Sequence, residues 1–414
     1  MSKLALGIDI GSSGVRAIAI DADGTVVAEA KAGLPEPDRS QGMICTDAAD
    51  WWQAVESCLH SMPRDRIGAI AVDGTSGTLL LCKADGTPLC PARRYDDAGS
   101  AAHAVRIKDL APAESAAHGA TSPAAKLHDL QGAHPEAAMA LHQADWVVGK
   151  LTGRFGVSDD NNALKTGWDP VARTWPDWLD TFGIGRRLLP EVLEPGTAVG
   201  QAVPELGFAP GAVVVAGTTD GCASFLATGA DQPGDGVTAL GTTLTLKLLS
   251  DRPLFDPAAG VYSHRLLGMW LAGGASNTGG AALLRFFTAE RMRELEPLLE
   301  PDHPTGLDFW PLAGKGERFP VADPAMESRH EPRPDSDARF FQALLEGVAK
   351  VEQRAYARLV ELGAPRLCSV RTVGGGAANK AWTRIRERIL NVPMPSPESE
   401  QAAYGTALLA RRAL

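Results

Sequence analysis

The chain has 414 residues, of which 44% are hydrophobic, and a formal net charge of −10 at pH 7. Because single hydrophobic cores stop growing at about 250 to 300 residues, this length predicts two domains. The acidic balance argues against nucleic-acid binding, which needs clustered Lys and Arg. No apolar run has membrane-spanning length, and the first residues are too polar for a signal peptide. We therefore expect a cytoplasmic protein without nucleic-acid or membrane partners.

Strand-like and helix-like segments alternate through the first 100 residues. Residues 4–10 and 15–21 read as a pair of strands, 23–31 as a third strand, 49–61 as an amphipathic helix and 67–74 as a buried strand. Residues 78–90 repeat a pattern of strand, Asp-Gly turn and strand. This alternation predicts a mixed α/β domain.

The middle of the chain is richer in helices and loops. Residues 100–160 are Ala-rich and mainly helical, and 143–151 have a clear apolar face. Residues 160–212 are interrupted by Pro, Gly and Trp, so we expect loops and short helices there, followed by a central strand at 212–216. A helix-like stretch then leads into the polar, Gly-containing cluster 231–236, which is typical of a hinge. The domain boundary is expected near residue 230.

The second half opens like the first, with a strand, glycine turn and strand at 237–250, which suggests an ancient duplication. A strand, turn and helix follow at 268–287, and the Pro-rich, charged residues 296–338 read as surface loop. The long helix expected at 340–362 has an apolar face of Phe341, Leu344, Leu345, Val348, Val351 and Leu359. Residues 369–390 predict strand, glycine turn and helix, and 401–414 a terminal helix that is a candidate to pack on the first domain.

The cysteines and histidines do not suggest metal chemistry. Six cysteines are scattered without a CxxC pair, so we expect reduced and mostly buried thiols. The histidines include no HExxH sequence, and His118, His128, His134 and His142 stand at irregular spacing in a helical region. A metal site there is not expected.

The first glycine turn, residues 7–14, carries Asp9 at the end of a strand, followed by Ser12 and Ser13. A carboxylate in this position can hold hydrated Mg²⁺ while the amides and hydroxyls of the turn face phosphate groups. Taken alone, the turn is equally compatible with a hairpin capped by an Asp side chain.

Asp220 follows a buried strand and the small residues 217–219, and it precedes a helix. Such a residue is either a helix N-cap or a general base. The other glycine turns on the same chain favour the general base.

Two turns in the second half fit a nucleotide. Residues 374–376, Gly-Gly-Gly, offer a flat backbone surface to adenine, and Asn379 and Trp382 follow on the next helix. Gly241 and Thr242 can donate amides and a hydroxyl to phosphates. The alternatives are a tight crossover and an ordinary β-turn. Neither a Walker A sequence nor a GxGxxG fingerprint occurs, which disfavours P-loop and Rossmann folds.

With these motifs in this order, the chain resembles the FGGY carbohydrate kinases, within the superfamily of actin, Hsp70 and sugar kinases. The resemblance runs end to end, through LGIDIGSSGVRAIAID, AGTTDGCASFLATGA, LGTTLTLKL, GGGAANKAW and AYGTALLA. It implies a two-domain actin-like ATPase fold of the ribonuclease H-like type. It also implies a sugar-binding domain at 1–229 and a nucleotide-binding domain at 230–414.

Four further segments resemble a compact subgroup of cyanobacterial and plant plastid kinases that act on D-ribulose: 73–82, 160–170, 260–265 and 316–324. The resemblance implies transfer of phosphate from ATP to the C5 hydroxyl of a ketopentose, giving D-ribulose 5-phosphate. A D-xylulose kinase remains an alternative, and so does a nucleotide-dependent switch with weak ATPase activity. A monomer and a homodimer are both compatible with the sequence.

The resemblance assigns roles to individual residues. Asp220 is the expected catalytic base, and Asp9, Ser76 and Asp220 are expected to contact the ketose. Asp9 is also expected to hold Mg²⁺ through water. The residues expected to bind ATP are Ser12, Ser13, Gly241, Thr242, Gly375, Gly376, Asn379 and Trp382.

One departure concerns the sugar. Many relatives carry Trp-x-Asp-x-Arg where this chain has Tyr95-Asp96-Asp97-Ala98-Gly99. The missing Arg leaves the identity of the sugar open and does not affect the residues expected for phosphoryl transfer.

Overall fold

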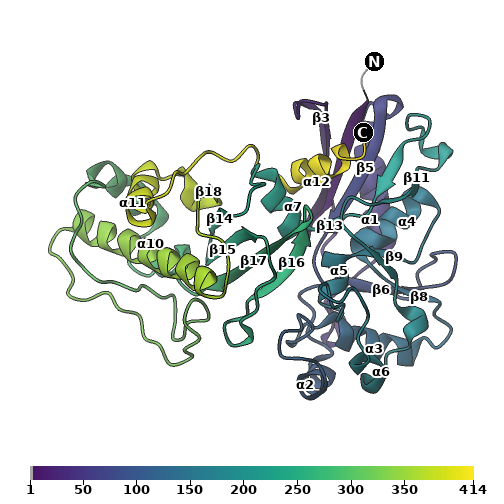
Figure 1. Cartoon of the computed structure of the whole chain (residues 1–414), viewed down its shortest axis with the longest axis horizontal. Coiled ribbons are helices and arrows are strands. Elements are labelled where there is room, and N and C mark those ends of the chain that lie inside the picture. The colour runs from purple at the N-terminus through teal and green to yellow at the C-terminus, as the bar shows by residue number, and fades with distance from the viewer. Residues whose placement is uncertain (1–2) are drawn as a thin grey trace. The chain divides into compact units, whose positions relative to one another are not determined.

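A computed structural model describes residues 3–414, without the side chain of Gln41, and the chain divides into two compact units (Figure 1). Unit 1 comprises Met1–Ala227, His264–Leu267 and Gln401–Leu414, and unit 2 comprises Thr228–Ser263 and Gly268–Glu400. Within the described residues, no helix is both long and apolar enough to cross a membrane.

The main sheet of unit 1 has the strand order β11-β12-β5-β1-β2-β3, and β13 pairs with β5. Its strands are β1 (Leu4–Ile10), β2 (Gly14–Ile20), β3 (Val26–Gly33), β5 (Ile67–Gly74), β11 (Ala198–Gln201), β12 (Val213–Val215) and β13 (Thr218–Thr219). Both β1 and β5 are buried along their whole length, as expected for neighbouring parallel strands covered on both faces. The strands predicted at 4–10, 15–21, 23–31, 67–74 and 212–216 are therefore confirmed.

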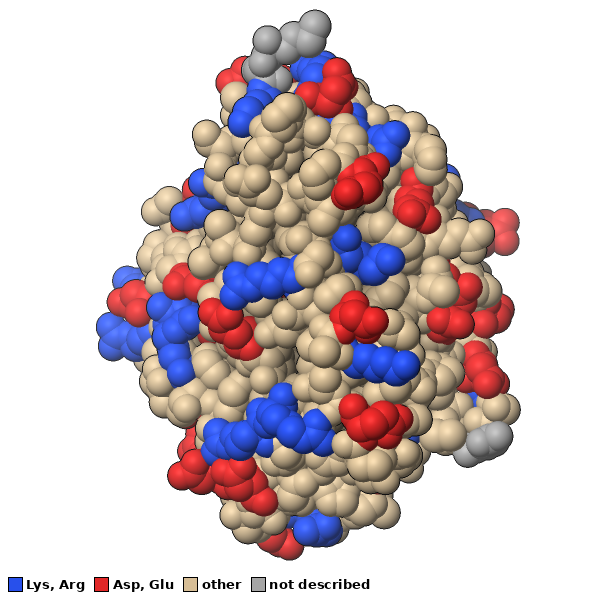
Figure 2. Space-filling model, turned by 90° about the vertical axis from the view of Figure 1, so that its right-hand side faces the viewer, with Lys and Arg blue, Asp and Glu red and all other residues tan. Residues whose placement is uncertain are grey.

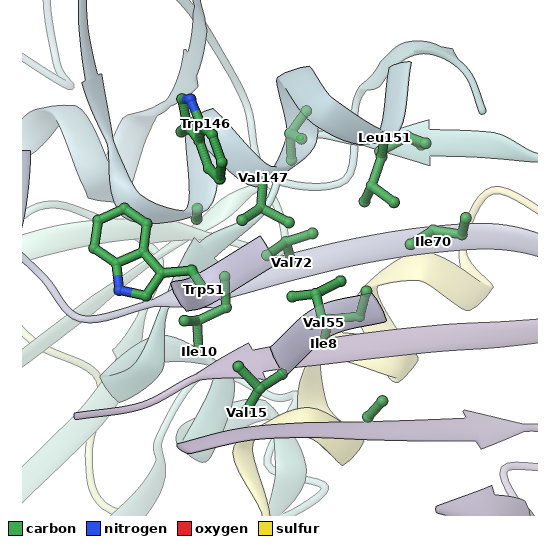
Figure 3. Packing of buried hydrophobic residues seen from close by; sticks show 14 of the residues in the cluster. Ile8, Ile10, Val15, Trp51, Val55, Ile70, Val72, Trp146, Val147 and Leu151 are labelled. Carbon is green, nitrogen blue, oxygen red and sulfur yellow. The ribbon is translucent and has the colours of Figure 1, made fainter. Parts of the chain in front are cut away.

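Helices cover the two faces of this sheet. The helices α1 (Ala48–His60) and α4 (Gln143–Thr152) pack on one face. In Figure 3, Trp51 and Val55 of α1 and Trp146 and Val147 of α4 meet Ile8 and Val72 from the sheet. The rings of Trp51 and Trp146 meet edge to face, with centroids 6.3 Å apart. The apolar faces of the strands and of the two helices thus pack together in one core.

The other face is covered by α7 (Asp220–Ala227) and α12 (Ala402–Arg411), which pack against each other, α7 also against β5 and β13 and α12 against β1 and β5. Their approach requires glycine. A Cβ at Gly7 would lie 2.1 Å from the carbonyl oxygen of Ala403, and a Cβ at Gly405 would lie 2.0 Å from that of Ala223. The terminal helix therefore completes the sheet on which the chain began.

Unit 1 also contains a smaller sheet of order β4-β7-β6-β8, formed by β4 (Cys45–Thr46), β6 (Leu79–Cys82), β7 (Ala92–Arg93) and β8 (Met139–His142). The remaining elements are α2 (Ala101–Leu110), α3 (Pro123–Ala133), α5 (Asp160–Leu164), α6 (Trp178–Phe182), β9 (Val157–Asp159) and β10 (Glu191–Leu193). The second strand predicted within 78–90 is wrong, because Pro88 makes only an isolated bridge to Cys82. Proline cannot donate to a strand ladder.

The sheet of unit 2 repeats the layout of the first, with β17-β15-β14-β18 in place of β3-β2-β1-β5. These strands are β14 (Asp235–Leu240), β15 (Leu244–Ser250), β17 (Met269–Ser276) and β18 (Ser369–Val373), and β16 (Tyr262–Leu266) pairs with β17 as the fifth strand of the sheet. As in unit 1, an antiparallel hairpin is followed by a strand that pairs in parallel with the first strand. The duplication hypothesis drawn from the sequence agrees with this repeated order.

The helices of unit 2 are α8 (Gly280–Leu284), α9 (Ala289–Leu295), α10 (Asp337–Glu361) and α11 (Lys380–Leu390), with a short 3-10 helix at Gly375–Ala378. All six apolar residues predicted to line one face of α10 are buried. The prediction that 296–338 is surface loop is wrong in part. The segment is mostly irregular, but Phe309, Trp310 and Phe319 are buried, and Phe309 and Trp310 pack in one core with α10.

Charged side chains of both signs are interspersed on the face shown in Figure 2.

The cysteines were expected to be mostly buried. Cys58, Cys82 and Cys222 are buried, whereas Cys368 is exposed. Burial at the strand and helix cores accounts for the first three.

A buried ion pair joins the helices and strands of unit 2. Arg386 of α11 and Glu352 of α10 are both fully buried, with Nε to Oε2 and Nη2 to Oε1 distances of 2.7 Å. Thr238 of β14 donates to Glu352, and Arg386 donates to Thr372 of β18, both at 2.6 Å. This ion pair thus connects α10, α11, β14 and β18 through hydrogen bonds.

We predict that Arg386→Met lowers the free energy of unfolding of unit 2 by about 3–5 kcal/mol, because it leaves a buried carboxylate without its partner. The measurement is urea denaturation followed by tryptophan fluorescence. Glu294→Gln is the control, because it removes an exposed pair with Arg291 worth about 0–1 kcal/mol. Equal destabilisation by the two substitutions would contradict the prediction.

Candidate active site

Strand pairing gathers acidic side chains at one edge of the main sheet in unit 1. Asp9 of β1 lies directly opposite Asp73 of β5, and Thr218 of β13 lies opposite Asp73 on the other side. Asp220 follows β13 at once, as the first residue of α7. The structure therefore brings together the predicted Asp9 and Asp220, and adds Asp73, which the sequence analysis did not identify.

Asp73 is completely buried and has one strong partner. Its Oδ2 accepts a hydrogen bond from the hydroxyl of Thr406 on α12, and Oδ1 receives none from a donor among the described residues. Burial raises the pKa of Asp73 well above its usual range, and the charges of Asp9 and Asp220 raise it further. Burial beside two other carboxyl groups thus favours the protonated form of Asp73.

Asp9 is the neighbour of Asp73 across the sheet. Burial raises the pKa of Asp9, and the hydrogen bond from Asp73 and the charge of Arg16 oppose that rise. Arg16 is the nearest cation, 3.4 Å from Oδ2, but its side chain is 55% exposed. Three neighbouring carboxyl groups beside a largely exposed arginine fit a hydrated divalent cation such as Mg²⁺.

Asp220 is held by the elements around it. Its Oδ1 accepts a hydrogen bond from the amide of Gly221 at 2.6 Å. Asn161 and Asn162 of α5 donate to the side chain and the carbonyl of Thr218, at 2.9 and 3.0 Å. The start of α7 is thus fixed from outside the sheet.

Lys165, directly after α5, is a second residue that the sequence analysis missed. Burial lowers the pKa of Lys165, and the negative charge of Asp220 opposes this. Lys165 and Asp220 therefore lie within electrostatic reach of each other.

Ser12 and Ser13 occupy the turn between β1 and β2. The amide of Gly11 donates to the carbonyl of Gly14 at 2.9 Å, which closes the turn. Both serine side chains are exposed, and the carbonyl of Ser12 accepts a hydrogen bond from Arg94 at 3.3 Å. The two hydroxyls are therefore accessible to a ligand, while hydrogen bonds fix the backbone of the turn.

Ser76 lies in the turn that follows β5. Its hydroxyl is buried and has no hydrogen-bond partner among the described residues. A buried hydroxyl without a partner is costly unless a ligand or water satisfies it. This is the strongest local sign that the turn binds a polar ligand.

The structure also explains why Gly99 stands where many relatives carry the Arg of Trp-x-Asp-x-Arg. A Cβ there would lie 2.7 Å from Nη2 of Arg93. Arg93 instead occupies that space and forms a buried ion pair with Asp97, with Nε to Oδ2 at 2.7 Å. Because Arg93 is only 4% exposed, it stabilises this segment and does not present its guanidinium to a ligand.

In unit 2, the remaining predicted residues line one cavity of about 590 Å³. The lining comprises Leu240, Gly241, Thr242, Gly280, Ala281, Leu283, Leu284, Ala289, Met292, Arg293, Glu296, Phe341, Leu345, Gly375, Gly376, Ala378, Asn379 and Trp382. An apolar cavity entered by glycine turns and a few polar groups is typical of a nucleotide site. The structure thus places Gly241, Thr242, Gly375, Gly376, Asn379 and Trp382 around a single volume.

Two of these residues also have structural tasks. Oδ1 of Asn379 accepts from the amide of Trp382 at 2.7 Å and caps α11, which leaves its amide nitrogen for a ligand. The indole of Trp382 donates to the carbonyl of Leu345 at 3.2 Å and is 4% exposed. A Cβ at Gly376 would lie 2.7 Å from this ring, whereas a Cβ at Gly375 would meet no atom within 4 Å.

A histidine cluster lies apart from these residues, where His103 of α2 bonds Asp129 of α3 at 2.9 Å and stacks on His128. The two rings are inclined by only 32°, with centroids 4.5 Å apart. One ligand atom each of His103, His128 and Asp129 lie within 4.8 Å of one another, a spacing compatible with a metal ion.

Comparison with known proteins places this geometry in a family. The family model for the N-terminal domain of FGGY carbohydrate kinases matches residues 4–227, and the model for the C-terminal domain matches residues 236–414. A curated xylulose kinase from Streptomyces coelicolor is 29% identical, over 98% of this chain and 86% of its own. An autoinducer-2 kinase from Yersinia enterocolitica is 26% identical, over 98% and 85%.

A solved structure gives the same answer for the fold. The crystal structure described as a "xyloylose kinase" from Brucella ovis superposes with a TM-score of 0.84 at 25% identity, covering 99% of this chain and 90% of its own. The expected two-domain actin-like fold of the sugar kinase type is therefore confirmed. Since both family models match and together cover nearly the whole sequence, the chain belongs to the FGGY family of carbohydrate kinases.

Proposed function

We propose that this carbohydrate kinase transfers the γ-phosphate of ATP to the C5 hydroxyl of a ketopentose, and that its substrate is D-ribulose. Residues 1–229 bind the sugar and residues 230–414 bind the nucleotide. The observation that carries the proposal is the group of Asp9, Asp73 and Asp220 at one sheet edge, together with the turn after β5, where the buried hydroxyl of Ser76 has no partner among the described residues.

In this mechanism Asp220 is the general base. The C5 oxygen of the sugar attacks the γ-phosphorus, the bond from that phosphorus to the β–γ bridging oxygen breaks, and Asp220 accepts the hydroxyl proton. Lys165 lies within electrostatic reach of this carboxylate. Asp9 and Ser76 orient the sugar through hydrogen bonds to its hydroxyls, which places the reacting oxygen.

The phosphate groups are held by backbone amides and hydroxyls. Ser12 and Ser13 serve from the first glycine turn, and Gly241 and Thr242 from the second. Gly375, Gly376, Asn379 and Trp382 form the adenosine side of the cavity. Mg²⁺, when bound with ATP, neutralises phosphate charge, and Asp9 would hold it through water.

The choice of D-ribulose rests on four segments, 73–82, 160–170, 260–265 and 316–324, which resemble D-ribulose kinases. The names of the relatives favour D-xylulose as a second candidate. The two sugars differ in the configuration of one hydroxyl, at C3. A misplaced hydroxyl in a polar pocket shifts binding by a few kcal/mol, so the pocket discriminates through single hydrogen bonds.

The identity of the sugar substrate is tested by an ADP-release assay with D-ribulose, D-xylulose, L-ribulose, glycerol and no sugar. We expect the highest kcat/KM with D-ribulose and little ADP without a sugar. A higher kcat/KM with D-xylulose would show that the proposed substrate is wrong and would leave the proposed phosphoryl transfer unchanged. ADP release that no sugar accelerates would instead support a nucleotide-dependent switch.

We predict that Asp220→Asn lowers kcat by about 10² to 10⁴-fold, because the amide cannot accept the hydroxyl proton. The thermal midpoint should stay close to that of the unmodified protein. Asp23→Asn, at an exposed turn between β2 and β3, is the control for changing one carboxylate. A near-normal kcat in Asp220→Asn would exclude this residue as the base.

We predict that Gly375→Ala raises KM for ATP by about tenfold, because the new methyl group enters the cavity of unit 2 and crowds the nucleotide. The thermal midpoint should not change, since no protein atom lies within 4 Å of the added Cβ. Gly314→Ala is the matched control, because its Cβ also meets no atom within 4 Å and the residue does not line the cavity. An unchanged KM for ATP in Gly375→Ala would argue against a nucleotide at this turn.

A further inference from the structure

Lys126, on α3, is a completely buried lysine that the mechanism above does not use. Its ammonium group donates to the carbonyl of Gly77 at 3.1 Å and to the carbonyl of Arg94 at 2.5 Å. Among the described residues it forms no ion pair with a carboxylate. A buried charge bonded to carbonyl groups and not paired directly with a carboxylate is costly, and a side chain of similar size without charge would fill the same space. Packing alone therefore does not explain a lysine here.

The two carbonyls belong to the segments that frame Ser76. Gly77 follows Ser76 directly, in a left-handed conformation with φ of 103°, and a Cβ there would lie 3.2 Å from Cγ of Pro123 at the start of α3. Arg94 precedes Tyr95, whose amide donates to Thr78 at 3.1 Å. One ammonium group thus ties the turn after β5 to the segment after β7.

The other end of the turn is fixed from α4. The side-chain oxygen of Gln143 accepts hydrogen bonds from the amide of Thr75 at 3.0 Å and from its hydroxyl at 2.7 Å. Thr75 and Thr78 are joined at 2.6 Å. Between these two anchors stands Ser76, whose buried hydroxyl has no partner among the residues that the structure describes.

We propose that Lys126 is a positioning residue for the sugar: by fixing the carbonyls of Gly77 and Arg94, its ammonium group holds the turn that presents the Ser76 hydroxyl to the ketose. The proposal rests on the proposed function, in which Ser76 contacts the sugar. Lys126 itself touches neither substrate. Its removal should weaken sugar binding and leave nucleotide binding unchanged.

The first test is Lys126→Met, which keeps the length of the side chain and removes the donor. We expect KM for D-ribulose to rise at least about tenfold, the effect of losing hydrogen bonds from a charged group, while KM for ATP stays within about twofold. Lys150→Met is the matched control, because Lys150 lies on α4 with its ammonium over the ring of Trp52. Equal increases in both KM values, or none, would overturn the proposal.

The second test needs no variant. Burial lowers the pKa of Lys126 to about 8, and the charged groups that face it are Asp97 and Asp96, which oppose the shift, and Arg93 and Lys165, which add to it. As the pH rises from 7 to 9.5 the ammonium loses its proton and donates more weakly, so KM for D-ribulose should rise while KM for ATP stays level. A sugar KM that is flat over this range would overturn the proposal.

The pH profile of Lys126→Met separates the two lysines, because burial also lowers the pKa of Lys165. We expect the alkaline rise in sugar KM to disappear in Lys126→Met. If the rise persists there, Lys165 causes it and the role of Lys126 is excluded. D-xylulose replaces D-ribulose in both tests if the assay of sugars shows greater turnover with it, and an enzyme that phosphorylates neither overturns the proposed function and this inference together.

Discussion

The register of three parallel strands is the constraint on which the candidate site depends. Strand β5 has β1 on one side and β13 on the other, with Asp73 opposite both Asp9 and Thr218. Because the carboxyl ends of parallel strands meet at one edge of a sheet, these side chains and the following Asp220 gather there. A slip of one residue would turn Asp9 to the opposite face, into the core formed with α1 and α4. Hydrophobic packing on that face therefore also fixes the acidic groups on this one.

The sequence predicted most of the fold because its strands are uninterrupted apolar runs that end in glycine turns. The long helix of unit 2 was equally clear from its spacing of apolar residues, all of which are buried. The segment 296–338 was misjudged, because Phe309, Trp310 and Phe319 are isolated aromatic residues among prolines and charges. Their burial comes from partners distant in the sequence, such as α10, which no local pattern reveals.

The site shows the same division between local and long-range information. The glycine turns led to six residues of the candidate nucleotide cavity, because a glycine turn can be recognised from the local sequence alone. Asp73 was missed because its importance comes from its neighbour across the sheet, Asp9, and from Thr406 on a helix near the other end of the chain. Lys126 was missed because a lysine in an Ala-rich helix is expected to face solvent. Its burial is decided by which backbone carbonyls lie beside α3.

The helix α12 follows all of unit 2 in the sequence, yet it belongs to unit 1, where it lies against Gly7 and supplies Thr406 to Asp73. During synthesis on the ribosome, the part of the first sheet that α12 covers stays exposed until unit 2 has been translated. Contacts between such distant parts of a chain form slowly. The nascent protein therefore exposes part of an apolar sheet while unit 2 is being translated, and chaperones bind surfaces of this kind.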